Sequence, residues 1–396
     1  MLRGLLFFLV CIYGVVTAGF VEDTLAIRYI LDKNGKTGTP VMDVADTSYK
    51  RVTDLFLMQQ GLVELHDTIA VLTELVTLNV DGNQLSTLPP GIGKLTNLRV
   101  LRASGNKLSQ LPQAIAGCSL LTRIELDRNS MTSIPAEFSR LTRLELLSLR
   151  SNKISNIPRS LNDLRSLRFL YIDHNEIIAI DEMLDSLVQI EVISLNNNLL
   201  TNFPLCWCKL SRLRKLDLSS NRILSIPDQI YGLQSITDLY LSANRLSSLP
   251  PSLGELLNLR WLYVDDNKLE KIPDELTSLT KLQWLSLSGN RLTALPETIG
   301  NMADMTVLSL AYNKITELPQ SITYLKELRI LRLNNNELVS LPQGIEVLHS
   351  LNWQRGEEKY GTLQLDGNRL CSLSKNPAEW ADKFAAGWRE SQVCDK

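Results

Sequence analysis

Histidine and aromatic residues are scarce in this chain of 396 residues. Only three histidines occur, at His66, His174 and His349, and aromatic residues make up 6% of the chain. None of these histidines belongs to an HExxH motif or to a cluster of cysteine and histidine. No nucleophile elbow, phosphate-binding loop or dinucleotide fingerprint is present. We therefore expect a protein that is not an enzyme, with no catalytic residues, no metal site and no cofactor.

Neither sign of charge is in excess. The chain holds 41 basic and 43 acidic residues, which gives a formal net charge of −2. Binding to nucleic acid or to an anionic membrane surface needs a concentration of positive charge. The composition therefore predicts no nucleic-acid partner.

Long apolar runs are missing after residue 18. Residues 1–18, MLRGLLFFLVCIYGVVTA, have an early Arg3, an apolar run and small residues that end at Ala18. This order indicates a signal peptide cleaved after Ala18. The alternative is a membrane anchor, but the run is shorter than the roughly 20 residues that a spanning helix needs. We expect a secreted, extracellular, cell-surface or periplasmic protein without stable membrane insertion after cleavage. An uncleaved chain would instead be an intracellular scaffold.

A repeat of 23 residues fills most of the chain. Each unit reads approximately LxxLxLxxNxLxxLPxxIxxLxx, as in residues 213–235, LRKLDLSSNRILSIPDQIYGLQS. The alternation in LxL predicts a short strand with one buried face. In the first unit Gln60 replaces the asparagine. The thirteen units begin at Val52, Leu75, Leu98, Leu121, Leu144, Leu167, Ile190, Leu213, Ile236, Leu259, Leu282, Met305 and Leu328.

The repeat resembles leucine-rich repeats of the 23-residue class over residues 52–373. The units are similar to those of secreted bacterial leucine-rich repeat proteins and of plant Ras-group-related leucine-rich repeat proteins. The resemblance implies an α/β solenoid, a curved horseshoe with a concave parallel β-sheet and a convex side of short helical and extended segments. It also implies a scaffold for protein interactions.

A fourteenth unit carries an insertion near residues 352–360. Leu363 stands where residue 354 would continue the pattern, so nine residues are added. The segment QRGEEKYG is polar and bounded by glycine, which predicts a protruding loop. It is either a tolerated insertion or a flap that faces a ligand.

Both ends of a solenoid need caps, because the last units expose their apolar core. Residues 19–51 are the expected N-terminal cap, with a short helix that directs Leu25, Ile27, Ile30 and Leu31 inward. Residues 374–396 are the expected C-terminal helical cap, in which three aromatics recur at helical spacing. These aromatics are Trp380, Phe384 and Trp388.

Two cysteines flank the C-terminal cap. In an exported protein, a disulfide between Cys371 and Cys394 would hold the cap in place. Two unpaired thiols are the alternative. The cap resembles those that close secreted leucine-rich repeat proteins.

Three further cysteines lie within the repeats. Cys118 occupies a core leucine position and is expected to be a small buried hydrophobic residue. Cys206 and Cys208 are too close in sequence to bond each other well. Trp207, at an isoleucine position, is expected to fill the core.

Charged residues in the N-terminal half are expected to pair across the sheet. Arg102 and Glu125 occupy equivalent positions of adjacent units, and Asp127, Arg150 and Asp173 alternate in sign along another column. Such pairs stabilise the sheet only slightly and leave little charge for a ligand.

Aromatic residues gather in the units from 236 to 304, at positions that should face solvent on the sheet. Exposed tryptophan and tyrosine are common binding hot spots. Alternatively, the rings simply cover one another on a strand face. Arg260 is the nearest cation that the columns suggest. The expected ligand-binding residues are Asp238, Tyr240, Arg260, Trp261, Tyr263, Asp265 and Trp284, with a smaller group at Phe169 and Tyr171.

The leading functional hypothesis is a non-enzymatic recognition module that binds a protein or peptide on the concave face. Glycan binding is an alternative, because aromatic rings beside carboxylates also suit sugars. A structural or adhesive protein is another.

Overall fold

The computed structural model describes residues 18–48, 50–182, 184–351, 354–355, 358–359 and 362–394. The chain divides into two compact units. The first extends to Ile177 and includes Ser186–Ile190, and the second comprises Ile178–Asp185 and the chain from Glu191 onward. Of the expected signal peptide, all but Ala18 lies outside the described residues.

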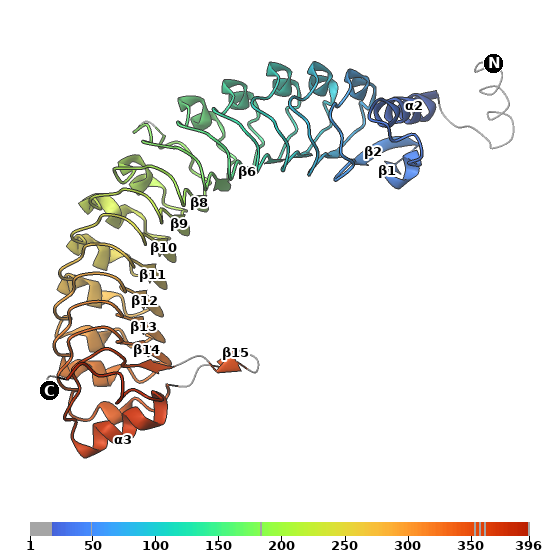
Figure 1. Ribbon diagram of the computed structural model, residues 1–396. Helices are drawn as coiled ribbons and strands as arrows, with labels where there is room; N and C mark the ends of the chain where they lie inside the picture. The colour runs from blue at the N-terminus through green and yellow to red at the C-terminus, as the bar shows by residue number, and fades with distance from the viewer. Residues whose placement is uncertain are drawn as a thin grey trace. The chain divides into compact units, whose positions relative to one another are not determined.

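In the first unit, the repeats that contain β2 to β6 each contribute one strand and one short 3₁₀ helix, and the repeat from Leu167 contributes β7 (Figure 1). Strands β2 to β7 pair in parallel and in register, so that Leu55, Leu78 and Leu101 align. The strands are β1 (Ala45–Ser48), which is antiparallel to β2, then β2 (Arg51–Phe56), β3 (Thr77–Asn79), β4 (Val100–Arg102), β5 (Arg123–Glu125), β6 (Leu146–Ser148) and β7 (Phe169–Tyr171). The 3₁₀ helices are η1 (Val41–Asp43), η2 (Asp67–Val71), η3 (Pro90–Lys94), η4 (Gln113–Gly117), η5 (Ala136–Arg140) and η6 (Arg159–Asp163).

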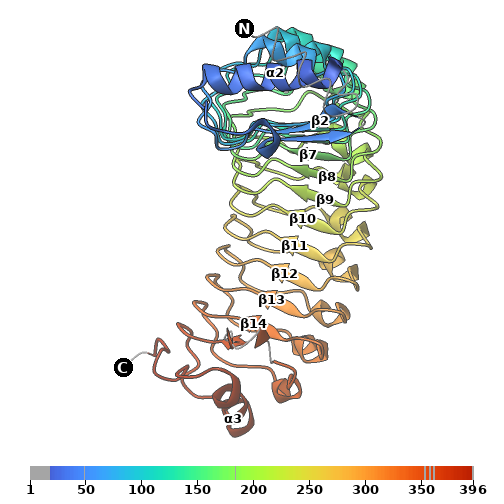
Figure 2. The ribbon, with the colours of Figure 1, turned by 90° about the vertical axis from the view of Figure 1, so that its right-hand side faces the viewer.

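The second unit repeats the same design, and Figure 2 shows its strands stacked one above another. Its parallel strands are β8 (Val192–Ser194), β9 (Lys215–Asp217), β10 (Asp238–Tyr240), β11 (Trp261–Tyr263), β12 (Trp284–Ser286), β13 (Val307–Ser309), β14 (Ile330–Arg332) and β17 (Leu363–Gln364). Its 3₁₀ helices are η7 (Leu205–Lys209), η8 (Asp228–Gly232), η9 (Pro251–Glu255), η10 (Asp274–Ser278), η11 (Ile299–Asn301), η12 (Gln320–Tyr324) and η13 (Ile345–Val347).

The predicted α/β solenoid is confirmed, and the core residues explain it. In β11 the middle residue, Leu262, is fully buried while Trp261 and Tyr263 on either side are half-buried. The following Val264 is also buried, so one face of each strand packs into the core. Most of the 3₁₀ helices follow the proline of the repeat, as Pro227 precedes η8. Proline suits this position because its ring fixes φ and it has no N–H to leave unpaired.

The repeated asparagine links each turn to the turn before it. Asn267 accepts a hydrogen bond from the backbone N–H of Leu246 at 2.9 Å. Its amide group donates to the carbonyl oxygens of Leu241, at 3.0 Å, and of Val264, at 3.2 Å. These backbone groups are buried, so the asparagine replaces water as their partner.

The insertion contains a short antiparallel pair. β15 (Gln354–Arg355) pairs with β16 (Glu358–Lys359), and the other inserted residues lie outside the described part of the chain. β17 then pairs with β14, with Leu363 opposite Leu331.

The N-terminal helix, α2 (Ala18–Lys33), packs on the first repeat. Ile27, Ile30 and Leu31 are buried, as predicted. The prediction for Leu25 was wrong, because its side chain is 50% exposed. Asp23 takes an inward position instead and is fully buried.

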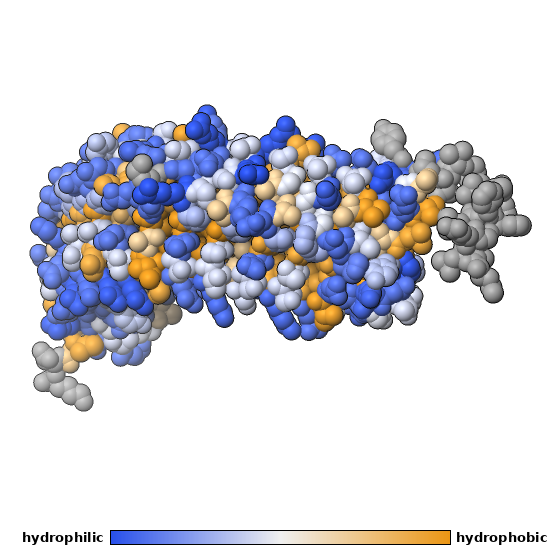
Figure 3. Space-filling model, turned by 90° about the horizontal axis from the view of Figure 1, so that it is seen from above, coloured by the Kyte–Doolittle hydropathy of each residue, from blue (hydrophilic) through white to orange (hydrophobic). Residues whose placement is uncertain are grey.

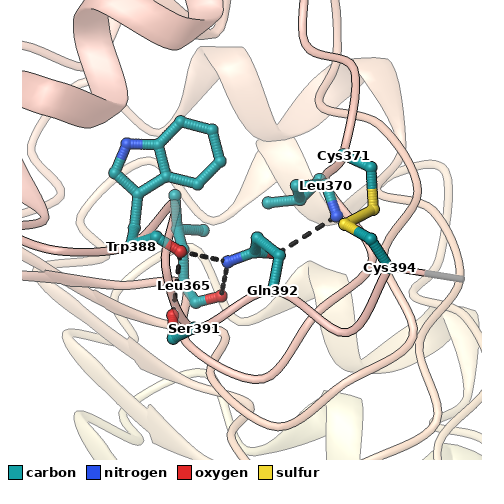
Figure 4. The surroundings of a disulfide bond; sticks show 7 residues. All are labelled: Leu365, Leu370, Cys371, Trp388, Ser391, Gln392 and Cys394. Atoms are coloured by element: carbon teal, nitrogen blue, oxygen red, sulfur yellow. Dashed lines mark hydrogen bonds between the residues drawn. A yellow bond between two sulfur atoms is a disulfide. The ribbon is translucent and has the colours of Figure 1, made fainter. Parts of the chain in front are cut away.

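The C-terminal cap is closed by the Cys371–Cys394 disulfide (Figure 4). Helix α3 (Lys375–Phe384) buries Trp380 and half-buries Phe384. The expectation that Trp388 continues the same helix was wrong, because the helix ends at Phe384 and Trp388 is buried from the turn that follows it. Between Trp388 and the disulfide, Gln392 donates to the carbonyl of Leu365 and accepts from the N–H of Leu370, both at 3.1 Å. The tail thereby continues the hydrogen bonding of the last repeat.

Candidate ligand-binding surface

Three aromatic rings and a lysine form a ladder across four neighbouring strands of the second unit. The rings of Tyr240 and Tyr263 stack with centroids 4.9 Å apart and planes 7° apart. The Tyr263 and Trp284 centroids are 5.5 Å apart, at a tilt of 33°. Lys215 places its Nζ 4.7 Å from the centroid of Tyr240. Since β9 and β11 flank β10, both faces of the Tyr240 ring are covered. We call these four residues the aromatic ladder.

Both tyrosine hydroxyls of the ladder stay protonated over a wider pH range than a free phenol. Burial, together with the Asp238 carboxylate, raises the pKa of Tyr240 to about 12. Burial and the Asp265 carboxylate also raise the pKa of Tyr263. The Tyr240 hydroxyl lies 3.4 Å from Oδ1 of Asp238. At neutral pH the ladder therefore presents neutral hydroxyl groups beside carboxylates.

Asp265 is held in place by serine residues of the two adjacent repeats. Its Oδ1 accepts hydrogen bonds from the Ser286 hydroxyl and from the Ser288 N–H, at 2.5 and 2.9 Å. Its Oδ2 accepts from the Ser242 hydroxyl at 3.2 Å. A carboxylate fixed by three donors has a defined orientation on the sheet.

The other predicted residues of this group lie beside the ladder without joining it. Trp261 is half-buried and aligned with Asp238 and Trp284 on the neighbouring strands. Arg260 is exposed, and within the described part of the chain its guanidinium makes no cation–π contact with the rings. The expectation that Arg260 is the nearest cation was wrong, because Lys215 contacts the ladder. The sequence alone could have identified Lys215 as a neighbour of the ladder, because it occupies the same repeat position as Asp238 in the preceding unit.

A groove of about 580 Å³ runs beside the ladder, and no pattern in the sequence predicts it. Small serine, glycine and alanine side chains at successive repeats leave this space open. Asp265 and Asp266 line one part of the groove, and Arg332 lines another. The lining residues are Ser242, Asp265, Asp266, Ser286, Ser288, Gly289, Ser309, Ala311, Tyr312, Arg332, Asn334 and Gln364.

The smaller predicted group lies in the first unit. The Arg150 guanidinium is 3.9 Å from the ring centroid of Tyr171, and that of Arg168 is 5.2 Å from Phe169. Arg150 also pairs with Asp173 at 2.9 Å. The predicted pairing of charges on this face is thus confirmed, and both rings already have a cation against them.

Two family models match the chain by sequence. One, described as leucine-rich repeat region, matches residues 205–289 and 271–359, and another, leucine rich repeat, matches residues 73–131 and 119–177. A solved leucine-rich repeat protein of Leptospira interrogans is 30% identical, with a TM-score of 0.67. That match covers 86% of this chain and 95% of the other. The chain belongs to the leucine-rich repeat proteins.

Other leucine-rich repeat structures share the fold. An internalin of Listeria monocytogenes is 22% identical, with a TM-score of 0.66, over 83% of this chain and 92% of its own. The ectodomain of the Arabidopsis thaliana receptor kinase GASSHO1/SCHENGEN3, solved in complex with CASPARIAN STRIP INTEGRITY FACTOR 2, is 30% identical with a TM-score of 0.51. That match covers 76% of this chain but only 44% of the receptor chain. Comparison with curated proteins finds no match.

The described part of this leucine-rich repeat protein contains no helix long and apolar enough to cross a bilayer. It also contains no group of three or more histidine, cysteine, aspartate or glutamate residues arranged to hold a metal ion. The face shown in Figure 3 carries small hydrophobic areas separated by hydrophilic ones. The aromatic ladder and the groove beside it form the candidate ligand-binding surface of the second unit.

Proposed function

We propose that this protein is a secreted or surface-exposed, non-enzymatic recognition module that binds a protein or peptide on the sheet face of its second unit. The observation that carries the proposal is the aromatic ladder. Its rings are half-buried, held by one another, and flanked by fixed carboxylates. Rigid aromatic side chains lose little conformational entropy on binding, which favours them as contact residues.

The comparisons support the same class of function. The Arabidopsis receptor ectodomain was solved with CASPARIAN STRIP INTEGRITY FACTOR 2 bound, and the plant peptide hormone receptor RGFR1 was solved in complex with RGF2. The latter is 25% identical, and this chain covers 63% of it. A peptide or protein ligand for the present chain is a proposal drawn from these relatives.

Export is part of the proposal. Residues 1–18 have the composition of a signal peptide, and the Cys371–Cys394 disulfide suits an oxidising compartment. An intact-mass measurement on protein from its native cells tests this point. A mass that includes residues 1–18 would contradict cleavage after Ala18.

Glycan binding is less favoured by the geometry. A sugar ring stacks on the face of an aromatic side chain, but both faces of Tyr240 are covered by Lys215 and Tyr263. Tyr263 likewise lies between Tyr240 and Trp284. The two tyrosines of the ladder therefore present ring edges and hydroxyl groups, which suit the mixed polar and apolar surface of a polypeptide.

The test is selection of random 12-residue peptides displayed on phage against the immobilised protein. We expect peptides that bind the wild-type chain and fail to bind the Trp261→Ala, Tyr263→Ala double variant. The matched control is Tyr231→Ala with Tyr324→Ala, which removes two exposed aromatics from the 3₁₀ helices of the same unit. Equal capture by wild type and the Trp261/Tyr263 variant, with unchanged circular dichroism, would contradict the proposed site.

A further inference from the structure

We infer that the groove beside the aromatic ladder takes an extended peptide segment of the partner, with a cationic side chain and an anionic side chain four residues apart. This inference rests on the proposed function and specifies its ligand. Two observations support it: the groove has an acidic part and a basic part, and the distance between these parts is set by the repeat.

The acidic part of the groove is formed by Asp265 and Asp266. The Asp265 carboxylate accepts hydrogen bonds from hydroxyl and N–H groups, which orient it but leave its charge unneutralised. Asp266 is exposed. Among the described residues, neither carboxylate forms a salt bridge. A lysine or arginine side chain is the complement of this pair.

The basic part is formed by Arg332, at the end of β14. Its side chain is half-buried, and no carboxylate of the described residues pairs with it. Asn334 beside it has a buried Oδ1 without a hydrogen-bond partner in the described structure, and this oxygen is suited to accept a backbone N–H of the peptide. Both groups line the groove. A half-buried guanidinium without a counter-ion favours an anionic group of the ligand, which would also compensate its desolvation.

Small hydroxyl side chains separate the two charged parts. Ser288 and Ser309 hydrogen-bond each other at 2.8 Å and line the floor. On the rim stands Tyr312, whose side chain is 63% exposed. Its backbone has φ of +55°, the conformation that the equivalent residue also adopts in the neighbouring repeats, at Asp266 and Gly289. The exposed tyrosine ring provides a contact surface along the groove.

The spacing of the ligand charges follows from the repeat. Arg332 is in register with Tyr263, three strand steps away, so it is separated from Asp265 by roughly 14 Å across the strands and roughly 7 Å along them. The two components give a distance of roughly 16 Å, and an extended peptide that rises about 3.3 Å per residue covers it with four to five residues. Side chains of an extended peptide alternate in direction, and only an even spacing points both charges at the protein. Spacings of three and five residues place one charge toward solvent.

The experiment uses peptides selected from the random 12-residue library. We expect pairs of a basic and an acidic residue to be enriched at a spacing of four residues over spacings of three and five. The best peptide is then synthesised with a fluorescent label, and its affinity is measured by anisotropy. Arg332→Glu should weaken binding by about tenfold or more, as expected for reversal of a partly buried charge. A peptide in which the acidic residue is replaced by lysine should restore binding to that variant.

Arg329→Glu is the matched control, because Arg329 is an exposed arginine just before the same strand that does not line the groove. It should retain wild-type affinity. Equal enrichment at all spacings, or no rescue of Arg332→Glu by the lysine peptide, would overturn the inference. The proposed function would survive that result if the Trp261/Tyr263 double variant still failed to bind. Absence of any selected peptide would overturn both.

Discussion

Asp23 on α2 forms a bidentate ion pair with Arg51 on β2, across the junction between the N-terminal cap and the first repeat. The Arg51 Nε lies 2.8 Å from Oδ2, and its Nη2 lies 3.0 Å from Oδ1. The same carboxylate accepts a hydrogen bond from the Val52 N–H at 2.9 Å. Asp23 is fully buried and is the acceptor for the Val52 N–H, whereas Arg51 also lies 3.4 Å from the Val71 carbonyl oxygen and from the Thr73 hydroxyl.

Asp23→Ala should therefore destabilise the N-terminal cap. The substitution leaves the buried Val52 N–H without an acceptor, at a cost of about 1–3 kcal/mol. Urea unfolding followed by circular dichroism measures the change. The control is Asp32→Ala, which removes an exposed carboxylate that pairs with Arg28 on the same helix and should change stability by less than about 1 kcal/mol. Equal effects of the two substitutions would contradict the role assigned to Asp23.

Asn267→Ala should destabilise the second unit. The substitution leaves the buried Leu246 N–H without an acceptor and removes the donor to the Leu241 carbonyl. We therefore expect the free energy of unfolding to fall by about 1–3 kcal/mol. Thermal melting provides the measurement. Asn258→Ala is the comparison, because Asn258 is exposed and bonds the Gln234 carbonyl at the surface. A melting temperature equal to that of Asn258→Ala would show that the asparagine is dispensable.

Alkaline pH should weaken the second unit through Tyr240. Its pKa is about 12 in the folded chain, against 10.0 for an unperturbed tyrosine. Between these values the folded state holds a proton that the unfolded state has lost, so the free energy of unfolding falls as the pH rises through this window. Absorbance at 295 nm should show a late step, well above pH 10, whose amplitude Tyr240→Phe reduces while the Tyr263 contribution remains. Tyr324→Phe, which removes an exposed hydroxyl, should keep the step.

The cysteines should fall into two chemical classes. Burial raises the pKa of Cys118 and Cys208 to about 12 and that of Cys206 to about 11, so little thiolate exists at pH 8. Iodoacetamide followed by mass spectrometry should label these three only after unfolding. Cys371 and Cys394 should need a reductant as well. Rapid labelling of Cys206 in the native protein would contradict its burial.

Much of the fold could be predicted because the repeat determines it. The leucines, asparagine and proline recur every 23 residues. Within a unit the leucines fill the core, the asparagine bonds the neighbouring turn, and the proline precedes the 3₁₀ helix. Trp207 and Cys118 could be assigned to the core for the same reason, and both are buried. Asp23 could not be predicted, because its inward position depends on Arg51, which lies 28 residues further along the chain.

The candidate site could be predicted only in part. Repeat positions show which residues are neighbours on the sheet, but they do not show in which direction a side chain turns. The stacking of Tyr240 on Tyr263 and the open space above the serines are therefore properties of the three-dimensional structure that the repeat pattern does not predict. Arg260 illustrates the difference, since it is adjacent in sequence to Trp261 and yet does not contact the ladder.

The hydrogen bonds of the repeat asparagines point in one direction along the chain. Asn267 reaches toward the preceding turn, as do Asn83, which bonds Leu62, and Asn368, which bonds Leu338. The first repeat has no repeat before it, and there Gln60 stands in place of asparagine. The two ends of the solenoid are consequently unequal. Removing repeats from either end breaks backbone hydrogen bonds of the sheet, such as that from the Val76 N–H to the Thr53 carbonyl. Removal from the C-terminus also takes away the asparagine that accepts from a buried N–H, whereas removal from the N-terminus leaves the next asparagine without that donor. Shortened versions of this protein should tolerate the second kind of trimming better than the first.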